Sequence, residues 1–369
     1  MKERVDADSA DVERYVAGSH MDTDDLRIRR WGLIGDDYLG PAFHILFKPG
    51  QVLYGSRRTY LRKVAVPDFE GICANTTFVV EASTGELLQE FLPLVMSTER
   101  FHEHSTQQSK GSVNPYINFS DLEWYEFPLP TVSEQRSILE LIAEFDLVAE
   151  RLRGARHSAT DLLRSLGKTI DSDESVRLDS LAGIQLGRQR SPKYEEGVRP
   201  LPYLRAANLK MDHVDWSDVK EMDFTHEEEE VYGLQPGDIL LVEGGDPDKV
   251  GAPTWFEGAD SPVCMQNTVV RVRVTSPEVH PRFLYWALRS AFEAGEFERV
   301  ATGTKLYHLG LKKLRPFEIP LLDPATQKDL ADKADACQHV GLMIESDLSA
   351  VSSARRALLN SLLRGETRV

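Results

Sequence analysis

The sequence is poor in cysteine, in long apolar runs and in any apolar leader. Its three cysteines, Cys73, Cys264 and Cys337, lie far apart and form no CxxC pair. They are too few for a disulfide framework and too scattered for a structural zinc site. No run of about 18 apolar residues is present, which argues against a membrane-spanning helix. The polar start Met1–Asp6 is unlike a signal peptide. We therefore expect a cytoplasmic protein.

Positive charge is also scarce overall but is locally concentrated. The 369 residues carry a net charge of -16, which alone argues against a nucleic-acid partner. However, the segment 48–63 holds five basic and no acidic residues, and the segment 305–315 holds four basic and no acidic residues. Such runs are either ordinary solvated surface or local faces that bind phosphates. Charge alone leaves both interpretations open.

The sequence contains two diverged copies of one pattern, separated by about 190 residues. Lys48-Pro49-Gly50-Gln51 returns as Gln235-Pro236-Gly237-Asp238, and Lys110-Gly111-Ser112 returns as Thr302-Gly303-Thr304. Phe127-Pro128-Leu129-Pro130 returns as Phe317-Glu318-Ile319-Pro320. Because the matches keep their order and nearly their spacing, they indicate an internal duplication.

Each copy combines short apolar runs, separated by turn signals, with amphipathic stretches. In the first copy, segments 52–54, 64–66 and 76–80 predict strands and 87–104 predicts a helix. In the second copy, 239–242 and 268–274 predict strands and 283–297 predicts a helix. The mixture predicts an α+β fold.

Each copy is followed by a long helical pattern with apolar residues spaced alternately by three and four. This spacing is typical of a coiled-coil seam. The first helix, with Ser133 as the expected N-cap, has the seam Ile138, Leu141, Phe145, Val148, Leu152, Ala155, Ala159, Leu162 and Leu166. The second has Leu330, Ala334, Cys337, Gly341, Ile344, Leu348, Val351, Arg355, Leu358 and Leu362. Gly341 and Arg355 interrupt the apolar character, so a break or a polar contact is expected there.

Two matching seams in one chain predict that the helices pack on each other in antiparallel orientation. The alternative is that each helix packs only on its own domain. From Ile138 to Leu166 the helix would span about 42 Å. This is slightly more than the roughly 34–36 Å between half-sites one DNA turn apart, so the helices would serve as a ruler. The predicted domains are 1–133, a spacer helix 134–175, a second domain 176–322 and a C-terminal spacer helix 323–369.

These residues together resemble the specificity (S) subunit of a type I restriction–modification system, over nearly the whole chain. In the first copy the resemblance rests on Arg14-Tyr15-Val16, the run 50–63, Gly71-Ile72-Cys73-Ala74-Asn75, Gly111-Ser112, Phe127-Pro128-Leu129-Pro130 and Ser133-Glu134-Gln135. In the second it rests on Pro202-Tyr203-Leu204-Arg205, Asn208, Gly237-Asp238-Ile239-Leu240-Leu241, Gln266-Asn267, Gly303-Thr304 and Ile319-Pro320.

The resemblance implies two target-recognition domains joined by two long antiparallel coiled-coil helices with pseudo-two-fold symmetry. Each domain would read one half of a bipartite double-stranded DNA site. The helices would dock two methyltransferase (modification) subunits, and through them restriction and translocase subunits. The chain itself would hold no cofactor, since S-adenosylmethionine and ATP are expected on the partner subunits.

Two departures from the family pattern stand out. The second copy has 27 residues from Val176 to Pro202, whereas only 14 residues precede Tyr15 in the first. The first domain is therefore expected to lack an opening strand and loop. Before the last helix, Pro324-Ala325-Thr326-Gln327 lacks the glutamate that family members usually carry.

Candidate DNA-binding residues are those that match groove-edge and phosphate chemistry. In the first domain they are Arg57, Arg58, Tyr60, Arg62, Lys63, Lys110 and Ser112. In the second they are Arg188, Arg190, Lys193, Arg205, Asn208, Thr304, Lys305, Tyr307, His308, Lys312 and Lys313. Each has the alternative of being an ordinary exposed side chain. The candidate partner-docking residues are Ile138, Leu141, Phe145, Val148, Leu152, Leu162, Leu166, Leu330, Ile344, Leu348, Val351, Leu358 and Leu362.

Motifs for catalysis are incomplete. Asn114-Pro115-Tyr116 lacks the second proline of the Asn-Pro-Pro-Tyr of amino-methyltransferases, and 244–251 lacks the Gly-Lys-Ser/Thr end of a P-loop. His102 and His104 have no further metal ligands nearby in the sequence. We therefore expect a non-catalytic DNA-recognition subunit that reads an asymmetric site. The alternative is a degenerate scaffold that binds methyltransferase without reading a full site.

Overall fold

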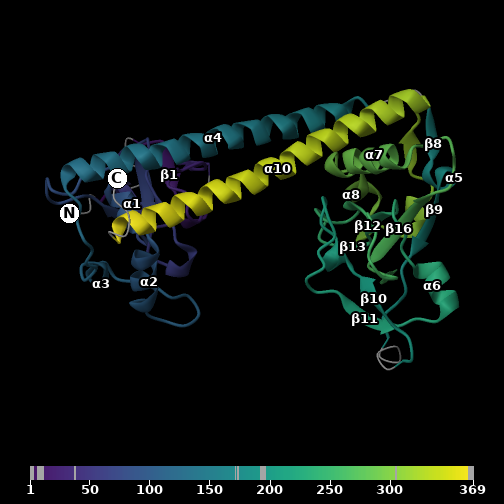
Figure 1. Cartoon of the computed structure of the whole chain (residues 1–369), viewed down its shortest axis with the longest axis horizontal. Helices are drawn as coiled ribbons and strands as arrows, with labels where there is room; N and C mark the ends of the chain where they lie inside the picture. Colours follow the sequence, from purple (N-terminus) through teal and green to yellow (C-terminus); the bar gives the residue numbers. More distant parts are fainter. Residues whose placement is uncertain are drawn as a thin grey trace. The chain divides into compact units, whose positions relative to one another are not determined.

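The structure is a computed structural model that describes residues 4–5, 12–36, 39–170, 172, 174–191, 197–303 and 306–364. The chain divides into two compact units. Unit 1 comprises residues 1–153 and 346–369, and unit 2 comprises residues 154–345. Both unit boundaries fall inside the two long helices, α4 (Val132–Lys168) and α10 (Pro324–Leu363), labelled in Figure 1.

Unit 1 contains two small sheets. The first has the order β2-β1-β6-β3 and the second β5-β4-β7. Their strands are β1 (Arg14–Val16), β2 (Gly32–Leu33), β3 (Phe43–Phe47), β4 (Val52–Gly55), β5 (Val64–Ala65), β6 (Gly71–Ala74) and β7 (Thr77–Val80). The helices are α1 (Leu92–Met96), α2 (Glu99–Gln107) and α3 (Phe119–Leu122), with the 3-10 turns η1 (Gly18–His20) and η2 (Thr59–Leu61).

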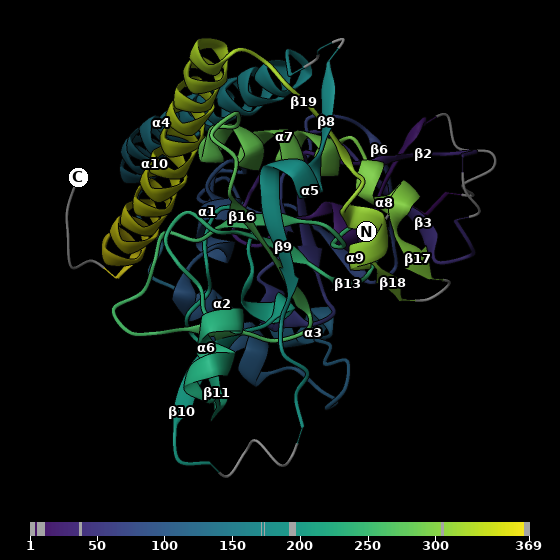
Figure 2. The same cartoon turned by 90° about the vertical axis from the view of Figure 1, so that its right-hand side faces the viewer.

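Unit 2 repeats this plan with additional strands. Its main sheets have the orders β14-β12-β16-β9, β11-β10-β15 and β13-β18-β17, and β19 pairs with β8. Its strands are β8 (Ser175–Arg177), β9 (Ala182–Leu186), β10 (Pro200–Leu204), β11 (Lys220–Asp223), β12 (Ile239–Val242), β13 (Gly244–Gly245), β14 (Pro253–Trp255), β15 (Cys264–Met265), β16 (Val269–Val274), β17 (Thr302–Gly303), β18 (Tyr307–His308) and β19 (Glu318–Pro320). Its helices are α5 (Leu178–Leu181), α6 (His226–Tyr232), α7 (Pro281–Glu293), α8 (Glu296–Val300) and α9 (Leu311–Leu314), with the 3-10 turn η4 (Ala206–Asn208). In Figure 2, β8 and β19 of this unit lie side by side.

The strands predicted from the apolar runs are confirmed within two residues at each end, because short buried β-branched runs carry a clear signal. Both predicted helices are instead pairs of helices. The segment predicted at 87–104 forms α1 and α2, which Ser97 and Thr98 separate. The segment predicted at 283–297 forms α7 and α8, separated by Gly295 with a φ of 73°.

The internal duplication is confirmed in the strand pairing. Strand β1 pairs in parallel with β6, joining Val16 to Cys73, and β10 pairs in parallel with β15, joining Tyr203 to Cys264. The turns before β4 and β12 also match, since Gly50 and Gly237 have φ values of 82° and 93° that favour glycine.

The two copies differ at the edge of one sheet. In unit 2, β16 lies between β12 and β9, and β8 pairs with β19. In unit 1, the equivalent strand β7 pairs with β4, and none of the described residues forms a strand on its other edge. This is the position that an opening strand of the first copy would occupy.

A buried glutamine anchors the start of each long helix to its unit. The Gln135 side chain donates to the carbonyls of Glu86 and Pro130 at 2.6 and 2.8 Å, and accepts from Leu88 N at 2.9 Å. Gln327 repeats this, donating to Glu278 and Leu322 and accepting from His280 N. Both side chains are 0% exposed, and their three partners are equivalent in the two copies. The same anchor therefore joins a loop to a helix twice.

The N-terminal caps of α4 and α10 differ, and the expected Ser133 cap is wrong. Helix α4 begins after Thr131, whose side chain and Glu134 form a reciprocal capping box. Helix α10 begins after Asp323, whose carboxylate accepts from Thr326 N at 3.1 Å. An aspartate cap thus replaces the missing glutamate in the second copy.

In both units the two long helices run antiparallel and pack on each other. In unit 1, Ile138 and Ile142 of α4 pack with Leu359 and Leu362 of α10, and Arg355 pairs with Asp146 at 2.7 Å. In unit 2, Leu163 and Leu166 lie beside Leu330 and Ala334. Helix α10 continues through Gly341 without a break, so only the polar contact expected at Arg355 is found.

The seam predicted for α10 is largely confirmed, but that of α4 is shifted. Ile142 and Ala149 are buried, whereas the predicted Val148 is 43% exposed. Further along, Leu163 packs into unit 2 and the predicted Leu162 is 54% exposed. A straight helix has 3.6 residues per turn, so its buried face moves away from a strict seven-residue repeat.

Candidate nucleic-acid interface

In unit 1, two loops form one exposed surface that we call surface A, comprising residues 57–60 and 110–116. Arg57 and Lys110 both bridge to Tyr116, with Lys110 N donating to Tyr116 O at 2.8 Å. The guanidinium of Arg57 lies 4.7 Å from the ring centroid of Tyr116. Arg58 N donates to Pro115 O at 2.7 Å, which fixes one loop against the other.

Surface A presents groups suited to phosphates and base edges. Arg57, Arg58 and Ser112 are exposed, and Tyr60 is 55% exposed. The side chain of Arg58 donates to Asn114 Oδ1 at 3.3 Å. Gly111, with a φ of 90°, makes the turn beside Ser112. Arginine and asparagine side chains together match guanine and adenine edges.

Three other candidates of unit 1 are engaged in hydrogen bonds or ion pairs that hold the loops. Lys110 pairs with Asp121 of α3 at 3.0 Å and lowers the pKa of that carboxyl. The ammonium of Lys63 donates to Gly18 O. Arg62 is only 15% exposed and pairs with Asp24 and Glu99 at 2.8 and 2.7 Å.

Unit 2 contains an equivalent of surface A, which we call surface B, comprising 244–250, 302–303 and 306–314 as described. Strand β18 pairs with both β13 and β17, so Tyr307 faces Gly245 and Gly303 as Tyr116 faces Arg57 and Lys110. His308 is exposed and its Nδ1 lies 3.0 Å from Glu243. Lys312 and Lys313 of α9 are exposed.

The remaining candidates of unit 2 take different positions. Asn208 is 2% exposed, and its amide donates to Asp215 O and Asp218 O at 3.0 and 3.1 Å. Arg188 is buried and pairs with Glu228 at 2.6 Å, and Arg205 pairs with Asp218 at 2.6 Å. Arg190 is exposed. Lys193, Thr304 and Lys305 lie outside the described residues.

Basic residues do not occupy equivalent positions on surfaces A and B. Helix α3 of unit 1 carries Ser120 and Asp121 where α9 of unit 2 carries Lys312 and Lys313. Conversely, the Arg57 position of unit 1 corresponds to Gly245 in the matched bridges. The shared framework therefore presents two different arrangements of charge.

Sequence reasoning missed two members of surface A, Asn114 and Tyr116. They were considered only as part of an incomplete methyltransferase motif. Their roles follow from contacts across more than 50 residues, from Arg58 to Asn114 and from Arg57 to Tyr116. The sequence signal available was their place four to six residues after Lys110 in the duplicated motif.

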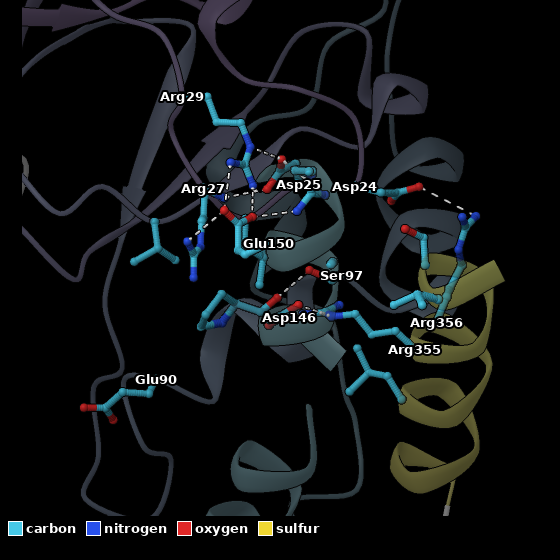
Figure 3. Close-up of a pocket in the computed structure, with 18 of the residues that line it drawn as sticks. Asp24, Asp25, Arg27, Arg29, Glu90, Ser97, Asp146, Glu150, Arg355 and Arg356 are labelled. Atoms are coloured by element: carbon cyan, nitrogen blue, oxygen red, sulfur yellow. Dashed lines mark hydrogen bonds and ion pairs between the residues drawn. The ribbon is translucent and has the colours of Figure 1, made fainter. Parts of the chain in front are cut away.

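A cavity of about 340 Å³, lined by several charged side chains, lies in unit 1 between the loop 24–29, α1 and both long helices. Figure 3 shows Arg29 and Arg27 reaching Glu150, and Arg355 reaching Asp146. Hydrogen bonds from Arg29 lower the pKa of Glu150 to about 2. Since these charges are paired with one another, the cluster is suited to fastening the unit to its helices.

No cluster of three or more potential metal ligands occurs among the described residues. None of the helices that the structure describes is long and apolar enough to cross a membrane.

The two-copy α+β architecture with paired long helices is shared with solved structures. A chain from a structure on complex assembly and conformational transition of the type I R-M system has a TM-score of 0.61 and 18% identity, covering 99% of this chain and 94% of that one. The type-I restriction-modification system S subunit from M. genitalium has a TM-score of 0.56 and 16% identity, covering 96% of this chain and 89% of that one.

Sequence comparisons agree. Residues 37–155 match the family model described as Type I restriction modification DNA specificity domain. The type I restriction enzyme MjaVIII specificity subunit of Methanocaldococcus jannaschii is 22% identical over 81% of this chain and 75% of its own length. The EcoDI specificity subunit of Escherichia coli is 26% identical over 41% of this chain and 34% of its own length. The resemblance predicted from the duplicated motifs is confirmed: the chain is similar to type I specificity subunits in sequence and in fold.

Proposed function

We propose that this chain is a sequence-specific DNA-recognition subunit of a type I restriction–modification complex. Unit 1 and unit 2 each contact one part of a bipartite, asymmetric double-stranded site through surfaces A and B. The chain makes no bond itself. Methylation is carried out by methyltransferase subunits that bind S-adenosylmethionine, and ATP-driven steps by restriction subunits.

The observation that carries the proposal is the repeated framework with unequal charges. In both units a tyrosine, Tyr116 or Tyr307, is bridged to two other segments, and this places loops on an exposed face. Basic side chains on these faces provide phosphate contacts, while polar and aromatic groups provide base contacts. Because Arg57 and Arg58 have no basic equivalents on surface B, the two half-sites differ.

The long helices offer the docking surface for partner subunits. Several predicted docking residues, such as Ile138, Ile344 and Leu362, are buried within the helix pairs and hold the helices together. Exposed apolar side chains on the same helices are available to a partner: Leu147, Val148, Leu162, Val340, Leu342 and Met343. We expect the partner contact to centre on these exposed residues.

A second function has one specific observation in its favour. Strand β7 of unit 1 lacks the neighbour that β9 provides for β16 in unit 2, among the described residues. A recognition unit without this strand would leave one half-site unread. The chain would then be a scaffold that binds methyltransferase subunits through its helices.

Co-purification with the neighbouring methyltransferase, followed by genome-wide mapping of adenine methylation, separates the two functions. Methylation at a gapped two-part motif supports the recognition subunit. Stable complexes that methylate no gapped motif support the scaffold and contradict the first proposal.

Charge reversal of Arg57 and Arg58 tests surface A directly. The double variant is expected to abolish specific binding of the cognate duplex and to leave the thermal unfolding temperature unchanged, because both side chains are exposed. Unchanged affinity for that duplex contradicts the assignment of surface A.

A further inference from the structure

Three backbone positions in unit 1 adopt a conformation that ordinary side chains disfavour. Among the described residues, the non-glycine residues with positive φ are Asp24, Arg58 and Arg62, with values of 56°, 51° and 53°. The left-handed conformation is uncommon outside glycine and asparagine, and such residues gather at functional sites. All three belong to the loop of surface A or to the residues that hold it.

Arg62 joins this loop to two carboxylates. It follows the turn η2, and its guanidinium donates to Asp24 at 2.8 Å and to Glu99 at 2.7 Å. Glu99 lies in the first turn of α2, and the bond from Arg62 lowers the pKa of its carboxyl. One planar guanidinium thus bridges two segments, a geometry that the point charge of a lysine does not reproduce.

Hydrogen bonds to backbone carbonyls fasten the same end of the loop. Leu61 O accepts from the Thr23 hydroxyl at 2.9 Å, and Arg62 O accepts from Asp24 N at 3.5 Å. The turn Arg58–Arg62 is closed by Leu61 N donating to Arg58 O at 2.7 Å. The loop therefore has little freedom to change the direction of Arg58 and Tyr60.

The bridge continues to the end of α10 that lies in unit 1. Asp24 also pairs with Arg356 at 3.6 Å, as Figure 3 shows, and Glu99 N donates to Asn360 at 2.9 Å. Loop, carboxylates and spacer helix form one connected network.

The network retains buried polar atoms that a purely structural core would avoid. Within the described part of the chain, Arg62 Nη2 and both ring nitrogens of His102 are buried without a hydrogen-bond partner. Unsatisfied buried polar groups lower stability. These buried groups lie beside Arg58 and Arg62, whose backbones are left-handed. We infer that the network serves to position the loop rather than to add stability.

We propose that Arg62 is a positioning residue that, through Asp24 and Glu99, holds Arg58 and Tyr60 of surface A in the orientation that reads the first half-site. This inference rests on the proposed function and adds to it a residue that acts without touching DNA.

The test measures half-site discrimination in the complex with the partner methyltransferase. Binding is compared for duplexes that carry the mapped gapped motif, or the motif with one half altered. The variants are Arg62→Gln and Arg62→Lys. A third variant, Asp24→Asn, removes the ion pair between Arg62 and Asp24, while asparagine still favours a positive φ at this position. The matched control is Arg30→Gln, since Arg30 is 58% exposed in its ion pair with Asp22 and lies outside the network.

Both Arg62 variants are expected to lose about tenfold or more of the discrimination for the half-site read by unit 1. Discrimination for the other half-site should stay within about twofold. Asp24→Asn should also lose discrimination for the half-site read by unit 1, but by a smaller factor than the Arg62 variants. Wild-type discrimination in Arg62→Lys would mean that charge alone matters and would overturn the proposal. Equal losses at both half-sites would also overturn it, because they indicate general destabilisation. A wild-type complex that methylates no gapped motif instead contradicts the proposed function itself, and with it this inference.

Discussion

At the scale of single residues, His102 is the clearest buried titratable group. It lies on α2, is 4% exposed, and is faced by Arg62, Asp24, Glu99 and Arg356. Burial is the main cause that lowers its pKa to about 4, and the nearby Arg62 acts in the same direction. The folded state therefore holds His102 neutral, whereas the unfolded chain takes up a proton below about pH 6.5.

The sign of the resulting pH dependence follows. Well above pH 6.5 His102 is neutral in both states and does not affect stability. As the pH falls from 6.5 towards 4, only the unfolded state gains the proton, so the free energy of unfolding decreases, by about 2 kcal/mol at pH 5. Denaturant unfolding at pH 7 and pH 5 measures this loss.

His102→Leu is the variant that isolates the effect, because it removes the titratable ring from a site that is already apolar in part. Most of the difference between pH 7 and pH 5 should disappear. Burial also lowers the pKa of His20, so a residual dependence of the same sign is expected to remain. Glu150, with a pKa of about 2, contributes only below about pH 4.5. A variant that keeps the full pH dependence would show that His102 is not its source.

Residue roles were the part least predictable from sequence. Arg62 was assigned to DNA because its basic run contains no acid, yet its partners Asp24 and Glu99 lie 38 and 37 residues away. Asn208 was assigned by its chemistry, and its amide instead closes a local turn to Asp215 O. Composition within a window gives the charge of a segment but not the partner that folding brings to it.

At the scale of elements, the repeated glutamine anchor has the most direct consequence. Replacing Gln135 by leucine removes three hydrogen bonds in a site that is 0% exposed and leaves three backbone groups without their partner. We expect a loss of about 2–5 kcal/mol in the free energy of unfolding. Gln327→Leu should have a similar effect, because its contacts are equivalent. The exposed Gln107 of α2 provides the control, and Gln107→Leu should change stability by less than about 0.5 kcal/mol. A Gln135 variant as stable as this control would show that the anchor contributes nothing.

Elements were more predictable than residues, and the reason is periodicity. Strand β12 is an unbroken apolar run after a Pro-Gly turn, and all four of its residues are buried. The long helices were predicted from their three–four spacing, and their antiparallel packing is confirmed. The face of α4 was less predictable because it meets α10 and a globular unit at once. Ala149 is buried at the edge of the cavity between the loop 24–29 and both long helices, while the larger Val148 is exposed.

At the scale of the whole molecule, the duplication separates what is shared from what differs. The parallel pairs β1–β6 and β10–β15 and the glutamine anchors recur in both units, so they define the framework. The basic residues do not recur in equivalent positions, and this difference is what the proposed bipartite, asymmetric site requires. A duplicated framework can thus acquire two specificities when its loops change and its core is retained.

This separation predicts that substitutions on surface A and substitutions on surface B affect DNA binding independently. Arg57→Gln with Arg58→Asn changes surface A, where asparagine tolerates the positive φ of position 58. Lys312→Gln with Lys313→Gln changes surface B on α9, at positions where the equivalent helix α3 already lacks lysine. Each pair should weaken discrimination at one half-site only, by about tenfold or more. Because the two surfaces belong to separate compact units, the losses in binding free energy should add within about 0.5 kcal/mol in the combined variant. Titration of the cognate duplex, and of duplexes altered in one half, measures the two double variants and the combined variant. If either pair relaxed both half-sites, or if the combined loss departed strongly from additivity, the two units would not read DNA separately.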